Sequence, residues 1–333
     1  MNARKLSIPC FSLCTLLLLF LRLSAAQLCH PNDKNTLLQI LDTMGNPPQL
    51  VSAWQLDINC CSSWAIDCNA DGRVTYFFAF KSDRSFQIPS VVGDLEYLQN
   101  FNFISCPNLN GTIPKKLTKL KHLETISVSS TNLTGPIPNY LGKITTLKNI
   151  YLNSNNISGS IPSSLGRLPN LTELDLSGNK LTGHIPKSLG SLIKPLSKIV
   201  LAANHLTGPI PRSLGNLNLS YVDLSLNNLR GDASFLFRKN KTALWYVNLG
   251  RNSLSFNFST VEIPSTVADL VVNNNKIYGG LPPSIAVPYF EEFNVSYNRL
   301  CGPIPAGGSL QLFDDFAFSH NLCLCGPPLP PCS

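Results

Sequence analysis

Two carboxylates in the middle of the chain, Glu173 and Asp175, lie two residues apart in the stretch Leu171-Thr-Glu-Leu-Asp-Leu176. On a β-strand, residues two apart share one face, and paired carboxylates are the acid and base of most glycoside hydrolases. Those enzymes hold the pair in an enclosed pocket that separates the two pKa values. Two neighbouring charges on an open strand lack such a pocket, so we predict that the protein is not an enzyme.

Metal and cofactor chemistry has no candidate site in the sequence. The five histidines are scattered and show no metal-ligand spacing; they are His30, His122, His184, His205 and His320. We therefore expect surface or loop positions for them and assign no metal and no cofactor.

The N-terminus has the features of a secretory signal peptide: Arg4 and Lys5, an apolar run at 16–21, and Ser24-Ala25-Ala26. Arg22 interrupts the run, which falls short of the ~20 residues of a membrane span. We predict cleavage after residue 26, which leaves 307 of the 333 residues and, with three cations removed, lowers the net charge from +7 to +4. That mild charge does not suggest a nucleic-acid partner, and we expect a soluble extracellular protein without a transmembrane anchor.

The side chains that could bind a partner must be positioned by one unit that repeats ten times between Val74 and Leu300. Nine intervals span 216 residues, a mean period of 24, between copies that begin at Val74, Leu98, Leu123, Leu147, Leu171, Leu196, Leu219, Leu244, Val267 and Phe290. The pattern Leu-x-x-Leu-x-Leu-x-x-Asn-x-Leu at this period is the leucine-rich repeat. It predicts an α/β solenoid, a curved right-handed superhelix with a parallel sheet on its concave face. The first, fourth and sixth side chains of each copy should point inward, where stacking buries them.

An asparagine column follows the strands at Asn155, Asn179, Asn204, Asn227, Asn252, Asn275 and Asn298. We interpret these residues as buried amides that satisfy backbone groups of adjacent coils, because unpaired buried polar groups are costly. Most copies continue with Gly-x-Ile-Pro and then Ser-Leu-Gly-x-Leu, as at 159–168, which predicts a short helical turn on the convex side. Copies seven and eight break this pattern at 231–234 and 255–258.

Two groups of four cysteines flank the repeats in a chain that we expect to be secreted, which indicates disulfides rather than metal sites. They are Cys29, Cys60, Cys61 and Cys68 in front and Cys301, Cys323, Cys325 and Cys332 behind. Four cysteines allow three pairings in each group. Cys106 falls in the asparagine column, and we predict a buried thiol there rather than an intermolecular disulfide. The predicted units are a signal peptide (1–26), an N-terminal cap (27–73), ten repeats (74–300) and a C-terminal cap (301–333).

Within the N-terminal cap, Asp33 is expected to be the N-cap of a helix that extends to Leu41. Pro47-Pro48 should end this helical pattern. Trp54 and Trp64 are expected to plug the open end of the first coil, because the terminal coils of a solenoid otherwise expose their core.

Strand alternation places the third, fifth and seventh positions of each copy on the concave face. These columns combine tyrosines with acids and amides, and tyrosine is a favoured interface anchor. We predict partner binding by Ser127, Asn149, Tyr151, Glu173, Asp175, Lys198, Tyr221, Asp223, Tyr246, Asn248 and Asp269. With the eighth position included, five acids (Glu173, Asp175, Asp223, Asp269 and Glu292) face three cations (Lys81, Lys198 and Arg251), so the face is locally acidic on a basic protein.

Gly-x-Ile-Pro coils are of the plant type. The motif Cys29-His-Pro-Asn-Asp-Lys34 lies in the cap before the repeats, and Cys323-Leu-Cys-Gly326 lies in the cap after them. Over the whole mature chain these features resemble plant polygalacturonase-inhibiting proteins. The resemblance implies the disulfides Cys29–Cys60, Cys61–Cys68, Cys301–Cys323 and Cys325–Cys332, with Cys106 outside this pattern. It also implies a place in the plant cell wall and a concave face that covers the cleft of a fungal endo-polygalacturonase, whose basic rim would meet the acids.

The same architecture is similar to a carrot-type antifreeze protein and to floral leucine-rich repeat proteins, so two alternatives stay open: ice binding and a developmental scaffold. A good ice-binding face repeats one small polar residue per coil. The third-position column is varied instead, which argues against ice binding; it begins Tyr76, Asn100, Thr125, Asn149, Glu173, Lys198 and Tyr221.

Two further sets of residues concern surfaces outside the concave centre. Four lysines beside His122 are either a solvated convex face or a contact for pectin, a polyanion; they are Lys115, Lys116, Lys119 and Lys121. Eight Asn-x-Ser/Thr sequons are candidate N-glycosylation sites: Asn110, Asn132, Asn156, Asn170, Asn218, Asn240, Asn257 and Asn294. A glycan on Asn294, in the fifth-position column, would limit docking at the C-terminal end of the face.

Overall fold

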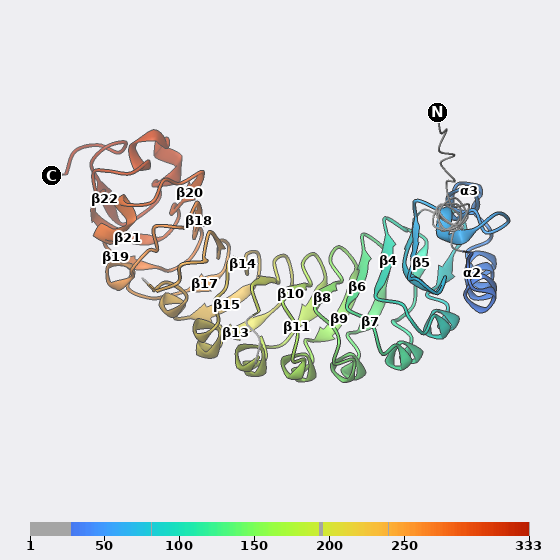
Figure 1. Cartoon of the computed structure of the whole chain (residues 1–333). Coiled ribbons are helices and arrows are strands. Elements are labelled where there is room, and N and C mark those ends of the chain that lie inside the picture. Colours follow the sequence, from blue (N-terminus) through green and yellow to red (C-terminus); the bar gives the residue numbers. More distant parts are fainter. Residues whose placement is uncertain (1–27, 81, 193–195, 239, 333) are drawn as a thin grey trace, which may run out of the picture.

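Stacked coils form one curved array between two caps (Figure 1). The computed structural model describes residues 28–80, 82–192, 196–238 and 240–332, so the predicted signal peptide and Lys81 lie outside the described residues. Strands line the concave side of the array and short helical turns line its outer side (Figure 1). The predicted leucine-rich repeat solenoid is confirmed.

The concave sheet has eleven strands in the described part of the chain, and all its neighbours are parallel except the first pair. Across the sheet they are β1 (Ile66–Cys68), β2 (Val74–Ala79), β4 (Asn100–Ile104), β6 (Thr125–Ser129), β8 (Asn149–Tyr151), β10 (Glu173–Asp175), β12 (Lys198–Val200), β14 (Tyr221–Asp223), β16 (Tyr246–Asn248), β18 (Asp269–Val271) and β20 (Glu292–Asn294).

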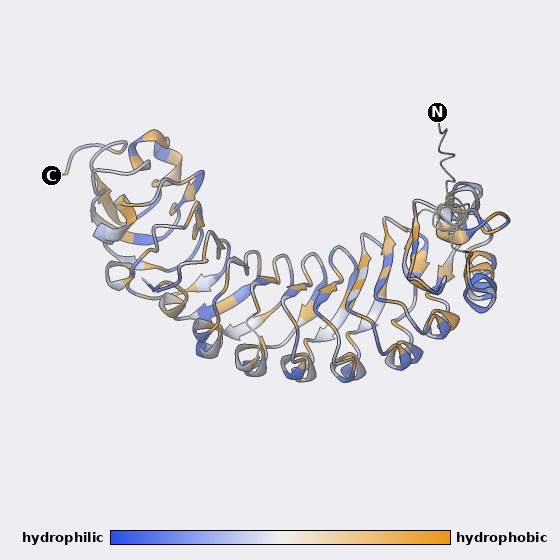
Figure 2. Cartoon of the chain, in the orientation of Figure 1, coloured by the Kyte–Doolittle hydropathy of each residue, from blue (hydrophilic) through white to orange (hydrophobic). Residues whose placement is uncertain are grey.

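The core is built as the repeat predicts. In the fifth copy the first, fourth and sixth residues, Leu171, Leu174 and Leu176, are fully buried between neighbouring coils. Each such side chain stabilises the fold by roughly 1.5–3 kcal/mol, and hydrophobic residues recur from coil to coil along the array (Figure 2). Phenylalanines take these places near the N-terminal end, where Phe77, Phe101 and Phe103 pack edge to face at 5.3–5.8 Å between ring centroids.

Smaller parallel sheets follow the concave strands in each coil, and 3-10 turns close the coil on the outer side. The strands are β3 (Phe86–Gln87), β5 (Leu109–Asn110), β7 (Thr134–Pro136), β9 (Asn156–Ser160), β11 (Lys180–Thr182), β13 (Thr207–Pro209), β15 (Asn228–Gly231), β17 (Ser253–Leu254), β19 (Tyr278–Gly279), β21 (Arg299–Pro303) and β22 (Cys323–Cys325). The turns are η2 (Ser90–Asp94), η3 (Lys115–Lys119), η4 (Asn139–Lys143), η5 (Ser163–Arg167), η6 (Lys187–Ser191), η7 (Arg212–Asn216), η8 (Ser234–Leu236), η9 (Phe258–Thr260), η10 (Pro283–Ala286), η11 (Leu310–Leu312) and η12 (Asp315–Ala317).

The predicted irregular copies are those with the shortened turns η8 and η9, which span three residues each against five in η2 to η7.

A left-handed residue follows each concave strand from β4 to β20, a feature that the repeat pattern did not reveal. The eighth position has φ between about 52° and 63° in coil after coil, for example at Ser154, Gly178, Ala203 and Arg251. Non-glycine residues pay of order 1–3 kcal/mol for that conformation unless the surrounding contacts hold it. Here the backbone amide of the residue bonds to the next coil, as Ala203 N does to Ser225 O at 3.0 Å, so the stacking supplies those contacts.

The asparagine column is a buried ladder, as predicted. Asn204 is representative: its amide nitrogen donates to carbonyl oxygens of its own coil at 3.2 Å and of the previous coil, at Leu176, at 3.0 Å. Its amide oxygen accepts from the backbone N–H of Leu181 at 2.9 Å. The column continues beyond the predicted residues into the C-terminal cap at Asn321, and Ser82, Cys106 and Thr131 occupy it in the first three coils. Cys106 is fully buried, and its thiol lies 3.6 Å from the carbonyl oxygen of Ala79.

The N-terminal cap contains α2 (Pro31–Thr43), α3 (Pro48–Trp54) and η1 (Cys60–Ser62). The prediction that Asp33 is the helix N-cap is wrong: His30 has that place, and Asp33 lies inside the first turn. Asp33 is fully buried and accepts two hydrogen bonds from the Arg73 guanidinium, at 3.0 and 3.1 Å, and one from the amide of Val74 at 2.8 Å. It therefore fastens the cap to the first strand of the array.

The first helix ends before Pro47, and Pro48 begins α3 instead of only ending the pattern, because proline is well suited to the first turn of a helix. Trp54 is fully buried and donates to the carbonyl oxygen of Phe78 at 2.9 Å, so it does plug the first coil. The same prediction for Trp64 is wrong, because its side chain is 67 % exposed.

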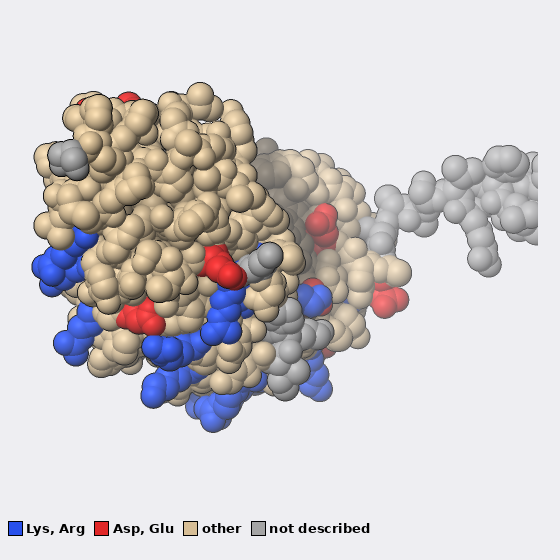
Figure 3. All heavy atoms as spheres, turned by 90° about the vertical axis from the view of Figure 1, so that its left-hand side faces the viewer, with Lys and Arg blue, Asp and Glu red and all other residues tan. Residues whose placement is uncertain are grey.

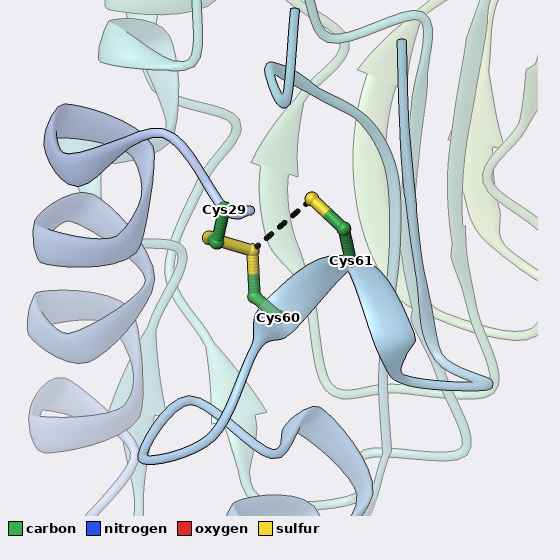
Figure 4. Close-up of side chains that lie close together, drawn as sticks. All are labelled: Cys29, Cys60 and Cys61. Carbon is green, nitrogen blue, oxygen red and sulfur yellow. Dashed lines mark hydrogen bonds between the residues drawn. A yellow bond between two sulfur atoms is a disulfide. The ribbon is translucent and has the colours of Figure 1, made fainter. Parts of the chain in front are cut away.

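Four disulfides join the pairs that the resemblance implies: Cys29–Cys60, Cys61–Cys68, Cys301–Cys323 and Cys325–Cys332. The sulfurs of Cys29, Cys60 and Cys61 gather within a few ångströms of one another (Figure 4). Because each is oxidised in a disulfide, none is a thiolate that would bind a metal ion. The caps are stapled covalently and need no metal.

Both ends of the concave sheet are covered. At the N-terminal end, β1 pairs with β2 in the antiparallel sense, and its register is broken by an irregularity between Asp67 and Cys68. At the C-terminal end, the amides of Val295 and Tyr297 donate to carbonyl oxygens of the cap at 2.8 and 3.0 Å. The smaller sheet at that end finishes at β22, beside the proline-rich tail 327–331. Among the helices that the structure describes, none has the length and apolar composition needed to cross a membrane.

Candidate partner-binding face

Three rows of side chains run across the concave sheet, one for each outward position of the strand; we call them together the concave face. The strand register places residues of one position side by side from coil to coil, roughly 4.8 Å apart. The third-position row is Tyr76, Asn100, Thr125, Asn149, Glu173, Lys198, Tyr221, Tyr246, Asp269 and Glu292. The fifth-position row is Phe78, Asn102, Ser127, Tyr151, Asp175, Val200, Asp223, Asn248, Val271 and Asn294.

An aromatic cluster forms the C-terminal centre of this face. The rings of Tyr221 and Tyr246 are parallel with centroids 4.0 Å apart, and Trp245 packs edge-on against Tyr221 at 5.3 Å. The ammonium group of Lys198 lies 5.2 Å from the centre of the Tyr221 ring, within cation–π range. Trp245 is 45 % exposed and was not among the predicted residues, because it is in the second position of its copy.

Acids border the aromatic cluster on both sides. Asp175 and Asp223 each accept two hydrogen bonds with one carboxylate oxygen, from the hydroxyl at 2.6 Å and the amide at 3.0 Å of the serine two residues later. These bonds fix the carboxylates and leave the second oxygen of each for a partner. Glu173 accepts a hydrogen bond from the Tyr151 hydroxyl at 2.8 Å.

The environment of Asp223, Asp269 and Glu292 favours the neutral forms of these three acids relative to water. Burial raises the pKa of Asp223 above its ordinary value, against the lowering effect of the Ser225 hydrogen bonds, and the negative charge of Asp175 raises it further. Burial also raises the pKa values of Asp269 and Glu292, and each carries a neighbouring acid that adds to the shift. Partly buried carboxylates that repel one another gain most from a cationic partner.

The N-terminal half of the face is different, since its polar groups bond to one another. The Asn149 amide nitrogen donates to the Thr125 hydroxyl at 3.3 Å and its oxygen accepts from Thr172 at 3.1 Å, while Ser129 donates to Asn153 at 2.7 Å. Of the predicted binding residues, Ser127 is buried, and the other ten are only partly buried. The acids of the two rows and the cluster of Tyr221, Trp245 and Tyr246 therefore lie from β10 to β20.

The outer side of the array carries cations on successive turns, at Lys143, Arg167, Lys187 and Arg212, which are all exposed. Figure 3 views the array from its C-terminal end and shows Lys and Arg gathered on this lower, outer side. The predicted lysine patch lies in and after η3. Lys116 pairs with Asp94 at 2.5 Å, whereas Lys115, Lys119 and Lys121 are exposed. His122 beside them stacks on Tyr97 with ring centroids 5.5 Å apart.

All eight sequon asparagines are exposed or partly buried, so none is closed to modification by the core. Asn294 lies in the fifth-position row at the C-terminal end of the concave face.

Comparison with known proteins agrees with this architecture. The leucine rich repeat family model matches residues 121–181 and 145–206. Polygalacturonase inhibitor 1 of Arabidopsis thaliana and the polygalacturonase inhibitor of Pyrus communis are each 54% identical over 308 residues, covering 92% of this chain and 93% of those proteins. Among solved structures, a plant ice-binding protein has a TM-score of 0.87 and 41% identity, covering 92% of this chain and 99% of that one. The resemblance in the sequence is confirmed: the chain belongs to the polygalacturonase inhibitor family of leucine-rich repeat proteins.

Proposed function

We propose that this protein is secreted into the plant cell wall, where its concave face binds fungal endo-polygalacturonases and blocks their cleft without chemical turnover. The observation that carries the proposal is the cluster of Tyr221, Trp245 and Tyr246 between the carboxylates of Asp175, Asp223 and Asp269. Open aromatic side chains are typical anchors of protein interfaces. Acids around them suit an enzyme whose cleft is basic, as the cleft of a pectate-degrading enzyme must be to bind its polyanionic substrate.

The distribution of charge supports this orientation of binding. The concave face carries the acids, while the outer turns carry exposed lysines and arginines. A basic partner is therefore attracted to the concave side and repelled from the outer side, which speeds productive encounter and adds specificity.

A reducing-end assay tests the proposal. Purified protein is titrated against a panel of fungal endo-polygalacturonases acting on polygalacturonate. Saturable inhibition that is lost in the triple variant Asp175→Ala, Tyr221→Ala, Asp223→Ala supports it. A triple variant on the outer side, Lys143→Ala, Arg167→Ala, Lys187→Ala, is the matched control and should inhibit like the wild type. No inhibition across a broad panel overturns the proposal, and pull-downs from plant wall proteins would then test a developmental scaffold.

One observation favours ice binding as a second candidate, besides the similarity to a plant ice-binding protein. Small hydroxyl side chains recur at one exposed position in four consecutive coils, outside the concave face: Thr134, Ser158, Thr182 and Thr207. Replacing Ser158 and Thr182 by Lys should abolish thermal hysteresis if this row binds ice, and should leave polygalacturonase inhibition unchanged.

Adhesion to pectin is an additional proposal that rests on the exposed lysines Lys115, Lys119 and Lys121. Their ammonium groups would bind de-esterified pectin and concentrate the protein in the wall, with retention that weakens as salt rises. Retention on a polygalacturonate column that survives replacement of these lysines and Lys116 by Gln would rule the patch out.

A further inference from the structure

An exposed tryptophan lies at the N-terminal end of the concave face, where its ring packs on Phe78 and Phe80. Trp64 is 67 % exposed, whereas Trp54, ten residues earlier, is fully buried and hydrogen-bonded. The indole of Trp64 stacks on the ring of Phe80 at 5.9 Å between centroids, and Phe80 stacks in turn on Phe78 at 5.5 Å. These three residues form what we call the N-terminal aromatic stack, whose outermost member has one ring face against Phe80 and most of its surface in solvent.

The backbone that carries Trp64 is held on both sides. Cys60 and Cys61 precede it and Cys68 follows it, and all three are in disulfides. The hydroxyl of Ser63 accepts from the amide of Ala65 at 2.9 Å, and the carbonyl oxygen of Ala65 accepts from the amide of Phe78 at 2.9 Å. A large apolar side chain on such a fixed backbone loses little conformational freedom when it binds, which is the property of a preorganised anchor.

The stack is continuous with the proposed binding face. Phe78 is the first residue of the fifth-position row, which continues through Asn102, Ser127 and Tyr151 to Asp175. From β2 to β14 there are six strand steps, or about 29 Å at roughly 4.8 Å per step. An interface of standard size buries about 800 Å² on each partner, equivalent to a disc about 32 Å across. One partner of ordinary size therefore spans the distance from Phe78 to Tyr221, the facing members of the two aromatic groups.

We propose that the concave face binds its enzyme partner at two anchors, the N-terminal aromatic stack and the cluster of Tyr221, Trp245 and Tyr246. This inference rests on the proposed inhibition of endo-polygalacturonase. The polar strands β4 to β8, some of whose side chains bond to one another, fill the interface without dominating its energy. Trp64 is then an affinity-determining residue in the cap, outside the repeats.

The test compares three variants in the reducing-end inhibition assay. Trp64→Ala should raise the inhibition constant about thirtyfold, the loss typical of an interface hot spot, and Trp64→Tyr should recover most of it. The matched control is Ile58→Ala in the same cap; Ile58 is 74 % exposed, but it lies with residues of α2 and α3 and not with the concave strands. This control should inhibit like the wild type.

Oxidative footprinting of the unmodified protein provides a measurement that does not depend on how a variant folds. Trp64 should become protected when the enzyme is bound, and full oxidation in the complex overturns the inference. An inhibition constant for Trp64→Ala within twofold of wild type, beside a weakened Asp223→Ala, also overturns the inference while leaving the proposed function intact. A wild-type protein that inhibits no enzyme overturns both.

Discussion

The asparagine ladder and the concave face are two sets of columns in the same coils, and they use the same kinds of side chain for opposite purposes. In the ladder, Asn204 uses both its donors and its acceptor within the protein. On the concave face, Asn248 accepts one hydrogen bond, from the amide of Gly250 at 3.0 Å, and is only partly buried. The ladder, whose amides are fully hydrogen-bonded, repeats one residue type from coil to coil, whereas the columns of the concave face vary in residue type. In these two sets, the repeated asparagines bond to their neighbouring coils, and the varied C-terminal centre of the face is open to another molecule.

The largest expected effect is on stability, in the ladder. Asn204→Ala should lower the free energy of unfolding by about 3 kcal/mol, because it leaves buried carbonyl and amide groups of two coils unsatisfied. The matched variant Asn248→Ala should lower it by less than about 1 kcal/mol. Urea unfolding followed by circular dichroism measures both. Equal losses would show that the two columns do not differ in kind.

Tyr221→Ala should have the reverse profile. We expect the inhibition constant to rise about thirtyfold, since the ring stacks on Tyr246 and contacts Lys198 at the centre of the face. The free energy of unfolding should change by no more than about 1 kcal/mol, because the ring is only partly buried. Titration against the enzyme and urea unfolding of the same preparation check the two halves. A large loss of stability would show that Tyr221 stabilises the fold, as the asparagines of the ladder do.

The pH dependence of stability and of inhibition should next distinguish the concave face, which carries acids, from the ladder, which carries none. The raised pKa values of Asp223, Asp269 and Glu292 mean that the folded state binds protons more readily than the unfolded chain. Their ionisation therefore makes stability fall as pH rises from the ordinary carboxyl range through the raised values, and Asp223→Asn should flatten that slope. Inhibition should change in the other direction and strengthen over the same interval, because ionised acids attract a basic cleft. Urea titrations and inhibition assays between pH 3.5 and about 6.5 measure both.

Salt should produce the smallest change. Raising ionic strength from 0.15 M to about 0.5 M should slow association with the enzyme a few-fold and leave the dissociation rate nearly unchanged, because screening acts on the approach of opposite charges. Surface plasmon resonance gives the two rates separately. An unchanged association rate would show that the acids do not contribute to the encounter, so that recognition would depend on the aromatic groups.

The repeat made most of the fold predictable. A fixed period places Leu171, Leu174 and Leu176 inward and Glu173 and Asp175 outward, and the same arithmetic identifies the ladder. The cap has no period, so its residues could be assigned only by type. Asp33 was expected to be a helix N-cap, but it lies inside the first turn and bonds Arg73, forty residues away in sequence. Trp64 was expected to plug the open end of the first coil, yet its side chain is exposed between the disulfide-bonded Cys61 and Cys68.

The residues of the candidate face were predicted from their positions in the repeat, which do not show the side-chain contacts between coils. Trp245 was missed because the second position of a copy lies just before the strand, outside the alternation that defines the concave face. Its contact with the ring of Tyr221 makes it part of the cluster. The pairing of Tyr151 with Glu173 likewise depends on two side chains from different coils. Alternation along one strand says nothing about such pairs.

The closed ends of the array also determine how the protein behaves at high concentration. Stacked coils with open ends would add to one another and grow into fibres, as unpaired sheet edges do. Here the antiparallel β1 with its broken register covers one end of the concave sheet, and the C-terminal cap and its proline-rich tail cover the other. In the described residues, neither edge of the concave sheet offers a strand that would continue its parallel ladder. The length of the concave sheet is therefore fixed within one chain, and crowded molecules should remain separate particles rather than polymerise.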